Sequence, residues 1–511
     1  MQYLFDAEEM QDLDTTAIET YGIPGIVLME HAAAESWRVI SEMKPRKIVV
    51  FAGPGNNGGD GLALARMAAI SGRCTLVVVA AGCERAASGS PTAIHMRSCR
   101  ELGIPIRVFR SDQPDSLDIA GEADLVVDAV LGTGLKQPVR EKLFPAFDLI
   151  AECRKAGARV VSLDLPSGLR DGAEAPERSV VADDTLTFGW AKRVLYSPWG
   201  RSRAGNIHCL DIGFPKQLEE RRTGPTLQLA DTTDLGRYLN PIPAAAHKGV
   251  RGHTAVLAGS EGMTGAARLC SEAAVRARAA LVTLYSETIP EGMSASIMTR
   301  FSQDIDAALN QTHRRIDAIA AGPGWGRHPS RVELVSKLPS YAPKGVLDAD
   351  ALAALADAEG VVLKDWVLTP HPAEAARLAG CSLDRVQADP VSTGRELAKR
   401  YECTVVIKAQ ASHIVAANGD TVVVDGNLAA LACGGSGDVL AGVIGGILAG
   451  GGSAFDASVA GVLAHAEAGR RLFRRRGWFN ADDLPLEISR VLAGIREPGA
   501  MEHEPTAWKL G

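Results

Sequence analysis

The sequence predicts an α/β protein made of two different domains. In the first half of the chain, short runs rich in Val, Ile and Leu alternate with helical patterns, which is typical of a parallel sheet covered on both faces. This alternation stops in a polar, proline-marked stretch at residues 214–249 and then resumes. A chain of 511 residues also exceeds one ordinary domain. We therefore expect domains at residues 1–222 and 223–511.

Apolar runs mark the expected strands of the first domain, at residues 47–52, 75–80, 106–109, 124–131, 159–165 and 207–212. Ahead of them, the first 40 residues read as two helices broken between residues 22 and 25, which pack on the sheet or on a partner chain. Parallel sheets bind ligands at the carboxyl ends of their strands, so functional residues should follow these runs.

The second domain has its own apolar runs, at residues 254–260, 280–286, 318–322, 345–352, 366–372, 404–408 and 421–426. The two halves share no motif, which indicates a fusion and not an internal duplication. Residues 439–455 are uncharged, but these 17 residues carry six glycines. A membrane span needs about 20 apolar residues, so we expect a buried helix with close backbone packing.

The composition favours a soluble enzyme of small molecules. Hydrophobic residues make up 46% and charged residues 23% of the chain, the profile of a globular protein. A net charge of −7 leaves no basic field for nucleic acid or an acidic membrane surface. Nine scattered cysteines without CxxC spacing read as free thiols, and the acidic N-terminus lacks signal-peptide features. We expect a cytoplasmic protein.

A glycine-rich loop follows the first expected strand of the first domain. Gly53, Gly55 and Gly58 formally satisfy GxGxxG, a pattern that alone favours a tight structural turn. A dinucleotide site would also want an acidic residue at the end of the second strand. That strand ends at residues 80–83, and Glu84 comes too late to fit.

Oxygen-bearing side chains gather at further strand ends of the same domain. Asp128 and Asp164 each lie near the end of a run, where they and Asn57 could converge. Each aspartate alone could cap a loop. With the nearby residues Gly132, Thr133, Gly134 and Ser167 they offer oxygen and neither sulfur nor imidazole, which suits a hard cation such as potassium or magnesium.

The most distinctive segment of the second domain is NLAALACGGSGDVLAGVIGGILAGGG, at residues 427–452. Its glycines can direct several backbone N–H groups to one point at the start of a helix, which makes a phosphate site. Asp438 is the only charge in this segment. Partial burial and a nearby phosphate would raise the pKa of Asp438 and make it a general base. The alternative is an ordinary helix N-cap.

At this point the motifs of the first half resemble a known family. GPGNNGGDG, DAVLGTGL and LDLPSG are similar to the N-terminal YjeF domain, the NAD(P)H-hydrate epimerase family, across residues 1–215. The resemblance implies a Rossmann-like fold, a potassium ion beside the substrate, and interconversion of R and S hydrates of NADH and NADPH. It places the ion at Asn57, Asp128 and Ser167, and acid/base work at Asp164. The implied substrate-binding residues are Asn56, Asn57, Gly58, Gly59, Asp60, Gly132, Thr133, Gly134, Leu135, Lys136, Gln137, Pro138 and Asp164.

Five motifs of the second half, at residues 247–269, 321–327, 368–378, 406–412 and 432–442, each have an ordinary reading. HPxE can start a helix, and Lys408 can simply be exposed. In this order they resemble the ADP- or ATP-dependent NAD(P)H-hydrate dehydratase family, a ribokinase-like fold, across residues 230–495. The implied nucleotide-binding residues are Lys408, Ala409, Gln410, Ala411, Ser412, Leu428, Ala429, Ala430, Leu431, Ala432, Cys433, Gly434, Gly435, Ser436 and Gly437. The implied hydrate-binding residues are Ala266, Gly324, His371, Pro372, Ala373, Glu374, Ala375, Ala376, Arg377 and Asp438.

The resemblance implies a mechanism as well. Asp438 would take the proton of the hydrate hydroxyl as the nucleotide phosphorylates it, and loss of phosphate would then regenerate the dihydropyridine. With ADP the other product is AMP. Glu374 parallels an acidic residue that organises Mg²⁺ through water in related kinases, although His371 replaces asparagine in that motif. Ala409 stands where the family usually has glycine, which leaves the choice between ADP and ATP open.

The combined hypothesis is a bifunctional repair enzyme for hydrated nicotinamide cofactors, working as a homo-oligomer. Two alternatives remain. The second domain could be a small-alcohol kinase that releases its phosphorylated product. The first domain could be a binding module without catalysis.

Overall fold

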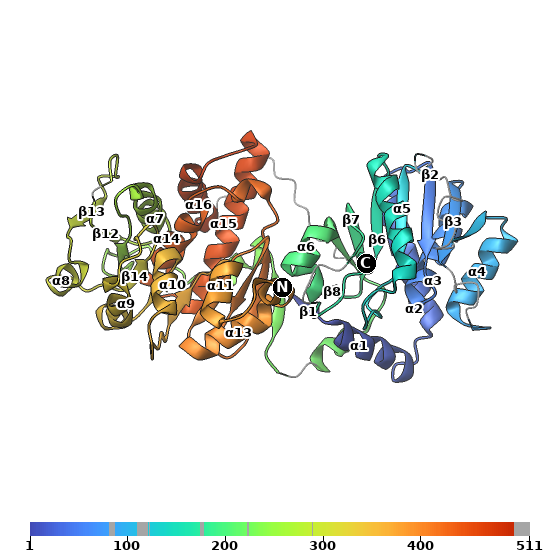
Figure 1. Ribbon diagram of the computed structural model, residues 1–511, viewed down its shortest axis with the longest axis horizontal. Coiled ribbons are helices and arrows are strands. Elements are labelled where there is room, and N and C mark those ends of the chain that lie inside the picture. Colours follow the sequence, from blue (N-terminus) through green and yellow to red (C-terminus); the bar gives the residue numbers. More distant parts are fainter. Residues whose placement is uncertain are drawn as a thin grey trace. The chain divides into compact units, whose positions relative to one another are not determined.

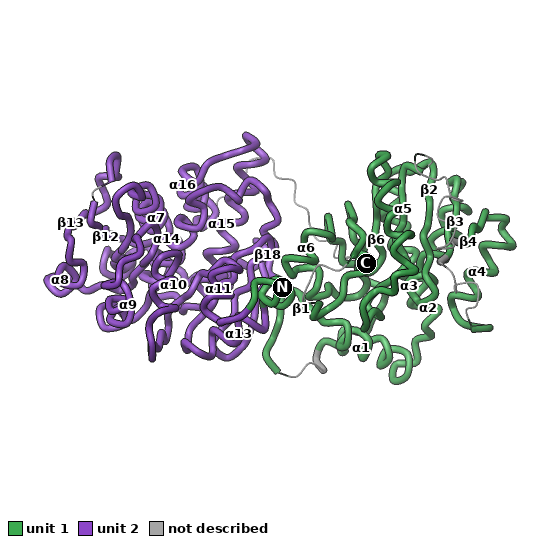
Figure 2. The backbone as a smooth tube through the Cα atoms, viewed as in Figure 1, with its two compact units in different colours: residues 1–229, 382–390 green, residues 230–381, 391–511 purple. Residues whose placement is uncertain are grey.

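The computed structural model describes residues 1–80, 87–109, 121, 123–173, 178–221, 224–288 and 290–494, and divides the chain into two compact units (Figures 1 and 2). Unit 1 holds residues 1–229 and 382–390, and unit 2 holds residues 230–381 and 391–511. The α/β class is confirmed. The boundary at residue 222 stays a prediction, since residues 222 and 223 lie outside the described part, as do residues 81–84.

Unit 1 is built on a parallel sheet in the order β4-β3-β2-β5-β6-β7-β9. Its strands are β2 (Lys47–Ala52), β3 (Cys74–Ala80), β4 (Ile106–Phe109), β5 (Leu125–Ala129), β6 (Arg159–Leu163), β7 (Asp184–Phe188) and β9 (Asn206–Leu210). The predicted strands are therefore present, and β7 is an addition. Its sequence, DTLTF, contains polar residues, so it was not predicted as an apolar run although the strand is buried.

Helices cover both faces of this sheet. Along β2 the side chains alternate, so that Ile48 and Val50 join one core and Val49 and Phe51 the other. The first core includes α2 (Gly25–Glu42), α3 (Asn56–Ile70) and α4 (Pro91–Glu101), and the second includes α5 (Phe144–Lys155). The helix break predicted near residue 22 is confirmed, because α1 (Ala7–Glu19) ends before Gly22, whose φ is +70°.

A small strand cluster completes unit 1. The strand β1 (Gln2–Phe5) pairs in parallel with β8 (Ala191–Lys192) and antiparallel with β10 (Leu227–Ala230). The short helix α6 (Pro198–Ala204) and the segment α12 (Leu383–Ala388) also belong to this unit.

Unit 2 has a sheet in the order β13-β12-β11-β14-β15-β16-β17-β18-β19, parallel except for its last two strands. The strands are β11 (His253–Leu257), β12 (Leu281–Ser286), β13 (Ile297–Phe301), β14 (Ala318–Ala321), β15 (Gly345–Leu347), β16 (Trp366–Leu368), β17 (Thr404–Ile407), β18 (Ala411–Val415) and β19 (Thr421–Asp425). The prediction of one strand over 345–352 is wrong in its second part. The chain leaves β15 at Asp348 and enters α10 (Ala349–Ala356).

Helices α7 (Thr264–Arg276), α14 (Ser436–Ala449), α15 (Ala454–Arg476) and α16 (Leu484–Leu492) pack together on this unit. Helices α8 (Ile305–Asn310), α9 (Ser330–Tyr341), α10, α11 (Pro372–Ala379) and α13 (Pro390–Tyr401) complete it (Figure 1). Among the described residues, no helix has both the length and the apolar character that crossing a membrane requires.

The predicted close packing of the glycine-rich helix is confirmed. On α14, a Cβ at Gly442 would stand 2.1 Å from the carbonyl oxygen of Cys270, and one at Gly446 would stand 2.5 Å from that of Ala274. Both carbonyls belong to α7. The two helices therefore touch backbone to backbone, which fixes the start of α14 relative to the sheet.

Candidate active sites

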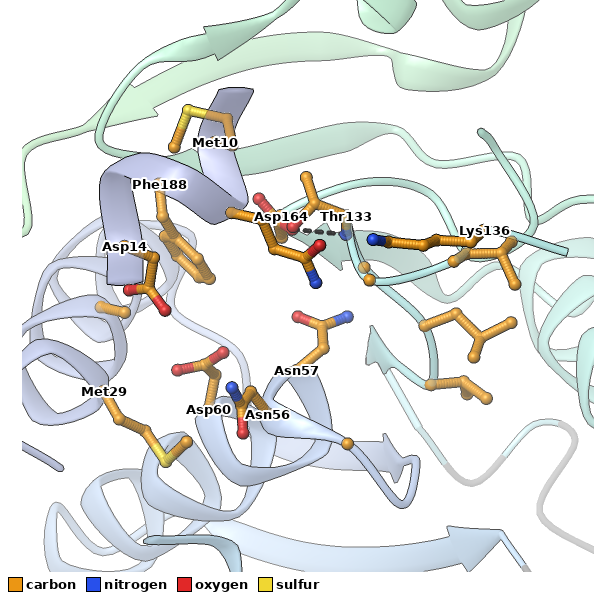
Figure 3. Close-up of a pocket in the computed structure, with 18 of the residues that line it drawn as sticks. Met10, Asp14, Met29, Asn56, Asn57, Asp60, Thr133, Lys136, Asp164 and Phe188 are labelled. Atoms are coloured by element: carbon orange, nitrogen blue, oxygen red, sulfur yellow. Dashed lines mark hydrogen bonds between the residues drawn. The ribbon is translucent and has the colours of Figure 1, made fainter. Parts of the chain in front are cut away.

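A cavity of about 1050 Å³ opens in unit 1 at the carboxyl ends of β2, β5 and β6 (Figure 3). Its walls are α1, the start of α2, the loop into α3, and the segment 130–143 after β5. Most residues predicted to bind the first substrate line it: Asn56, Asn57, Asp60, Gly132, Thr133, Gly134, Leu135, Lys136, Gln137, Pro138 and Asp164.

Gly58 and Gly59 are not among the residues that line this cavity. A Cβ at Gly58 would stand 1.8 Å from the carbonyl oxygen of Gly53, and one at Gly59 would stand 2.6 Å from Cε of Met29. Both positions are thus glycine because α3 packs tightly against its surroundings. Their role in the structure is to let the helix start close to the strand end.

The buried ammonium group of Lys192 holds Asp164 in place. Its Oδ1 lies 2.9 Å from Nζ of Lys192, and its Oδ2 accepts a hydrogen bond of 2.9 Å from the Thr133 amide. Its backbone φ of +62° is unusual for a residue other than glycine, and such strain often accompanies a functional site. Burial alone would raise the pKa of Asp164, but the Lys192 ammonium and the hydrogen bonds lower it below its usual value.

Two other carboxyl groups face the same space and behave in the opposite way. Figure 3 shows Asp14 from α1 and Asp60 from α3 directed into the cavity with Asp164. Burial, followed by the charges of Asp164 and Asp14, raises the pKa of Asp60 well above its usual value. Burial and Asp164 also raise the pKa of Asp14. The cavity thus holds one carboxyl group whose pKa is lowered beside two whose pKa values are raised.

Two of the predicted cation ligands, Asp128 and Ser167, are hydrogen-bonded to each other. The buried Asp128 carboxylate accepts hydrogen bonds from Ser167 Oγ at 2.5 Å, Ser167 N at 2.8 Å and Ser162 Oγ at 2.8 Å. Burial raises the pKa of Asp128, although these hydrogen bonds oppose the shift. The Asn57 amide is buried and neither of its polar atoms has a hydrogen-bond partner. An unpartnered buried oxygen fits a hard cation with few protein ligands, such as potassium.

No group of three or more His, Cys, Asp or Glu side chains in the described ranges is arranged to hold a metal ion. The cation site considered for unit 1 would use amide and hydroxyl oxygens beside one carboxylate.

The second candidate site lies at the start of α14 in unit 2. Gly435 is left-handed, with φ of +89°, and ends the glycine turn just before the helix. Asp438 follows in the first turn. Burial, then the neighbouring charge of Asp348, raises the pKa of Asp438 to about 6 despite the opposing charge of Lys408. Asp438 is thus poised as a base near neutral pH.

Asp348 was not predicted to have a role. It is 2% exposed and lies where β15 ends, within the sequence LDADAL. Its Oδ1 accepts hydrogen bonds from Lys408 Nζ at 2.5 Å and from Thr369 Oγ1 at 2.8 Å. A Cβ at Gly437 would lie 3.4 Å from Lys408 Nζ and 3.8 Å from Asp348 Oδ2. The ammonium of Lys408 therefore faces the glycine turn, and the reading of Lys408 as merely exposed is wrong.

A buried histidine supports the same turn. His465 from α15 has its Nε2 3.1 Å from both the hydroxyl and the carbonyl oxygen of Ser436. Burial lowers the pKa of His465 to about 4, so its ring is neutral. The histidine lies far from Ser436 along the chain, and the sequence carried no signal for this contact.

The remaining predicted hydrate-binding residues fall into two groups. A Cβ at Gly324 would stand 2.9 Å from the Cβ of Ala266, so these two residues lie side by side. His371 and Glu374 form a capping box at the start of α11, in which His371 Nδ1 accepts from the Glu374 amide and Glu374 Oε2 accepts from the His371 amide. The HPxE motif is thus a helix start, as its ordinary reading held.

Comparisons with known proteins agree with this division. One family model, described as YjeF-related protein N-terminus, matches residues 25–194, and another, described as NAD(P)H-hydrate dehydratase, matches residues 254–491. The bifunctional NAD(P)H-hydrate repair enzyme Nnr of Moorella thermoacetica is 32% identical, with 97% of each chain covered. The chain belongs to the family of bifunctional NAD(P)H-hydrate repair enzymes.

Further repair enzymes of this family match over nearly the whole chain. The Nnr protein of Escherichia coli is 32% identical and is matched over 93% of its length, against 95% of this chain. A Bacillus subtilis ADP/ATP-dependent NAD(P)H-hydrate dehydratase, co-crystallised with ATP/Mg²⁺, is 26% identical with a TM-score of 0.48, covering 53% of this chain and 99% of that one. The two family models and the curated relatives confirm both resemblances drawn from the sequence motifs.

Proposed function

We infer that this chain repairs hydrated NADH and NADPH with two active sites. Unit 1 epimerises the R and S hydrates, and unit 2 dehydrates the S hydrate with a nucleoside phosphate as co-substrate. The observation that carries the second activity is the Asp438 carboxyl at the glycine turn, beside the ammonium of Lys408. A base and a cation at a phosphate cradle are what phosphoryl transfer to a hydroxyl requires.

In unit 2 we assign the steps as follows. Asp438 takes the proton of the hydrate hydroxyl while the glycine turn and Lys408 hold the terminal phosphoryl group of the nucleotide. With ADP the products of this step are AMP and a phosphorylated hydrate. The carbon–oxygen bond then breaks with loss of phosphate, which is a better leaving group than hydroxide. A proton leaves the neighbouring ring carbon to solvent, and the double bond of the dihydropyridine is restored. Magnesium would supply charge neutralisation of the nucleotide phosphates, and Glu374 would help to hold it through water.

In unit 1 the carboxyl groups divide the work by their protonation. Epimerisation requires that the carbon–oxygen bond of the hydrated carbon break and re-form on the other face of the ring. Asp60, whose pKa burial raises well above its usual value, donates a proton to the departing hydroxyl, which leaves as water, and the ring nitrogen stabilises the resulting cation. Asp164, which is ionised, takes a proton from the water that adds. Groups whose pKa values are pushed apart in one cavity are suited to such acid and base roles.

Potassium is the cation that we propose for unit 1. Asn57 would supply its unpartnered amide oxygen, and Asp128 and Ser167 would complete the site. The ion would add positive charge near the substrate oxygens without taking part in proton transfer.

A direct experiment tests the whole assignment. Purified protein is incubated with separated R- and S-NADH hydrate, with and without ADP or ATP. We expect R/S exchange without nucleotide, and recovery of the absorbance of dihydronicotinamide with phosphate release when nucleotide is present. A stable phosphorylated product would instead identify unit 2 as a kinase. The relative rates with ADP and ATP decide the nucleotide preference.

Two broader properties remain predictions. We propose a cytoplasmic protein that forms a homo-oligomer. Light scattering after size-exclusion chromatography tests the assembly, and fractionation of the source cells tests the location.

A further inference from the structure

Lys192 is a lysine with an unusually buried side chain. It is 1% exposed and is among the largest fully buried side chains of the described residues. Burial of an ammonium group is costly unless it is paired and hydrogen-bonded. Lys192 meets both conditions, because its Nζ donates to the carbonyl oxygen of Phe188 at 2.6 Å and lies 2.9 Å from Asp164 Oδ1.

The backbone around Lys192 is fixed by the N-terminal strand. β1 pairs with β8 so that Phe5 lies opposite Lys192. The Phe5 ring lies 5.3 Å from that of Trp190, which in turn stacks on Phe214 at 5.3 Å. The Lys192 side chain lines the cavity, as does Phe214 of this aromatic cluster.

The partner of Lys192 is strained and surrounded by acids. Asp164 has its positive φ, and its second oxygen is held by the Thr133 amide. The other titratable groups around this pair are Asp60 from α3, Asp14 from α1 and Cys209 from β9, and Lys136 also lines the cavity. The charge of Lys192 lowers the pKa of Asp164 and opposes the rise in the pKa of Asp60.

We propose that Lys192 is a positioning residue of the epimerase reaction, whose buried ammonium holds the Asp164 carboxylate ionised and aimed into the cavity. The inference rests on the proposed epimerase function of unit 1. It gives a reason for a buried ion pair, which by itself contributes little to stability compared with a packed apolar pair. Without the ammonium, burial and the neighbouring acids would favour the protonated form of Asp164.

The test compares Lys192→Met, Lys192→Arg and Lys192→Met/Asp164→Asn with the wild type and with Lys155→Met, which changes an exposed lysine at the end of α5. R/S exchange of NADH hydrate is followed without nucleotide, as kcat, KM and pH profile. Dehydration of the S hydrate with nucleotide, by the other unit of the same chain, reports that the protein is intact.

We expect Lys192→Met to lower kcat for exchange by about 100-fold or more, the scale of general acid and base catalysis, with KM changed by less than about threefold. The acidic limb of its pH profile should move to higher pH. Lys192→Arg should restore part of kcat and return the limb toward the wild-type position. Lys155→Met should behave as wild type.

A purely structural role would give a different result. If Lys192 only anchored the Phe188 carbonyl, Lys192→Met would lower the melting temperature without moving the pH profile, and that outcome overturns the proposal. Should Lys192→Met alone fold poorly, the double variant, which removes both buried charges, should recover the wild-type melting temperature but not exchange. Recovery of R/S exchange in the double variant would also overturn the proposal. If the wild type itself shows no exchange, the epimerase function fails and not the role of Lys192.

Discussion

At the scale of single residues, the chemistry proposed for unit 2 depends on Asp438 as its general base. We expect Asp438→Asn to keep the shape of the side chain and remove the base. Dehydration should fall by about 10³-fold, the scale of a lost general base, while R/S exchange continues at the wild-type rate. Parallel assays of both activities on one preparation check this. Dehydration near the wild-type rate would show that another group takes the proton.

The raised pKa of Asp438 predicts the pH dependence of dehydration. The carboxylate must be unprotonated to act, so kcat/KM should rise with pH through about 6 and then level off. Asp348 contributes to this shift through its negative charge, second to burial. Asp348→Asn should therefore move the rising limb to lower pH, and kcat should also fall because Lys408 loses its partner. If the rising limb of Asp348→Asn stays at the wild-type pH, the charge of Asp348 does not affect the pKa of Asp438.

Asn57 supports a separate prediction about the proposed potassium site. Replacing potassium with tetramethylammonium at constant ionic strength should slow R/S exchange, because an organic cation cannot be coordinated by an amide oxygen and a serine hydroxyl. In Asn57→Leu, the rate should become insensitive to this replacement. Equal rates of the wild type in both salts would remove the ion from the mechanism.

In each site the residue proposed for catalysis could be predicted from the sequence. The residue that interacts with it could not. Asp164 ends an apolar run and Asp438 follows a glycine turn, so local pattern identified both. Lys192 and Asp348 act through contacts made only when distant segments fold together. Asp348 also lies in an apolar stretch that resembled a continuous strand.

At the scale of elements, the contact of α14 with α7 determines where the phosphate cradle lies. We expect Gly442→Ala to destabilise unit 2 by about 1–3 kcal/mol, because the new methyl meets a backbone oxygen that cannot move aside like a side chain. The midpoint of thermal unfolding should fall by several degrees. Gly265→Ala on α7 is the matched control, because no heavy atom lies within 4 Å of the added Cβ. It should leave the midpoint unchanged or slightly raised.

The element pattern also explains which strands the sequence revealed. Strands with both faces buried consist of uninterrupted apolar residues, as in β14 and in β2 after its first residue, Lys47, and these were predicted. β13 carries the exposed residues Thr299, Arg300 and Phe301, and β18 contains Ser412 and His413. Mixed composition of that kind does not distinguish a strand from a loop. At residues 345–352 the apolar letters continued across a change from strand to helix.

At the scale of the whole molecule, we propose that the two activities share a soluble intermediate and not a catalytic residue. We expect a mixture of Asp164→Ala and Asp438→Asn chains to repair R-NADH hydrate, although neither variant does so quickly alone. The S hydrate formed on one chain reaches the dehydratase of another by diffusion. Absorbance recovery from pure R hydrate measures this. Failure of the mixture, with each single activity intact, would show that the hydrate must pass within one chain.

The buried thiols offer a way to measure how often each unit opens. Cys99 in unit 1 and Cys270 in unit 2 are both fully buried, whereas Cys74 and Cys209 are exposed. Burial raises the pKa of Cys99 to about 11 and that of Cys270 well above its usual value, so neither reacts as a thiolate while its core is closed. The rate at which Cys99 is alkylated therefore reports how often unit 1 opens, and the rate for Cys270 reports how often α7 separates from α14. Mass spectrometry of labelled peptides would measure both rates in one sample.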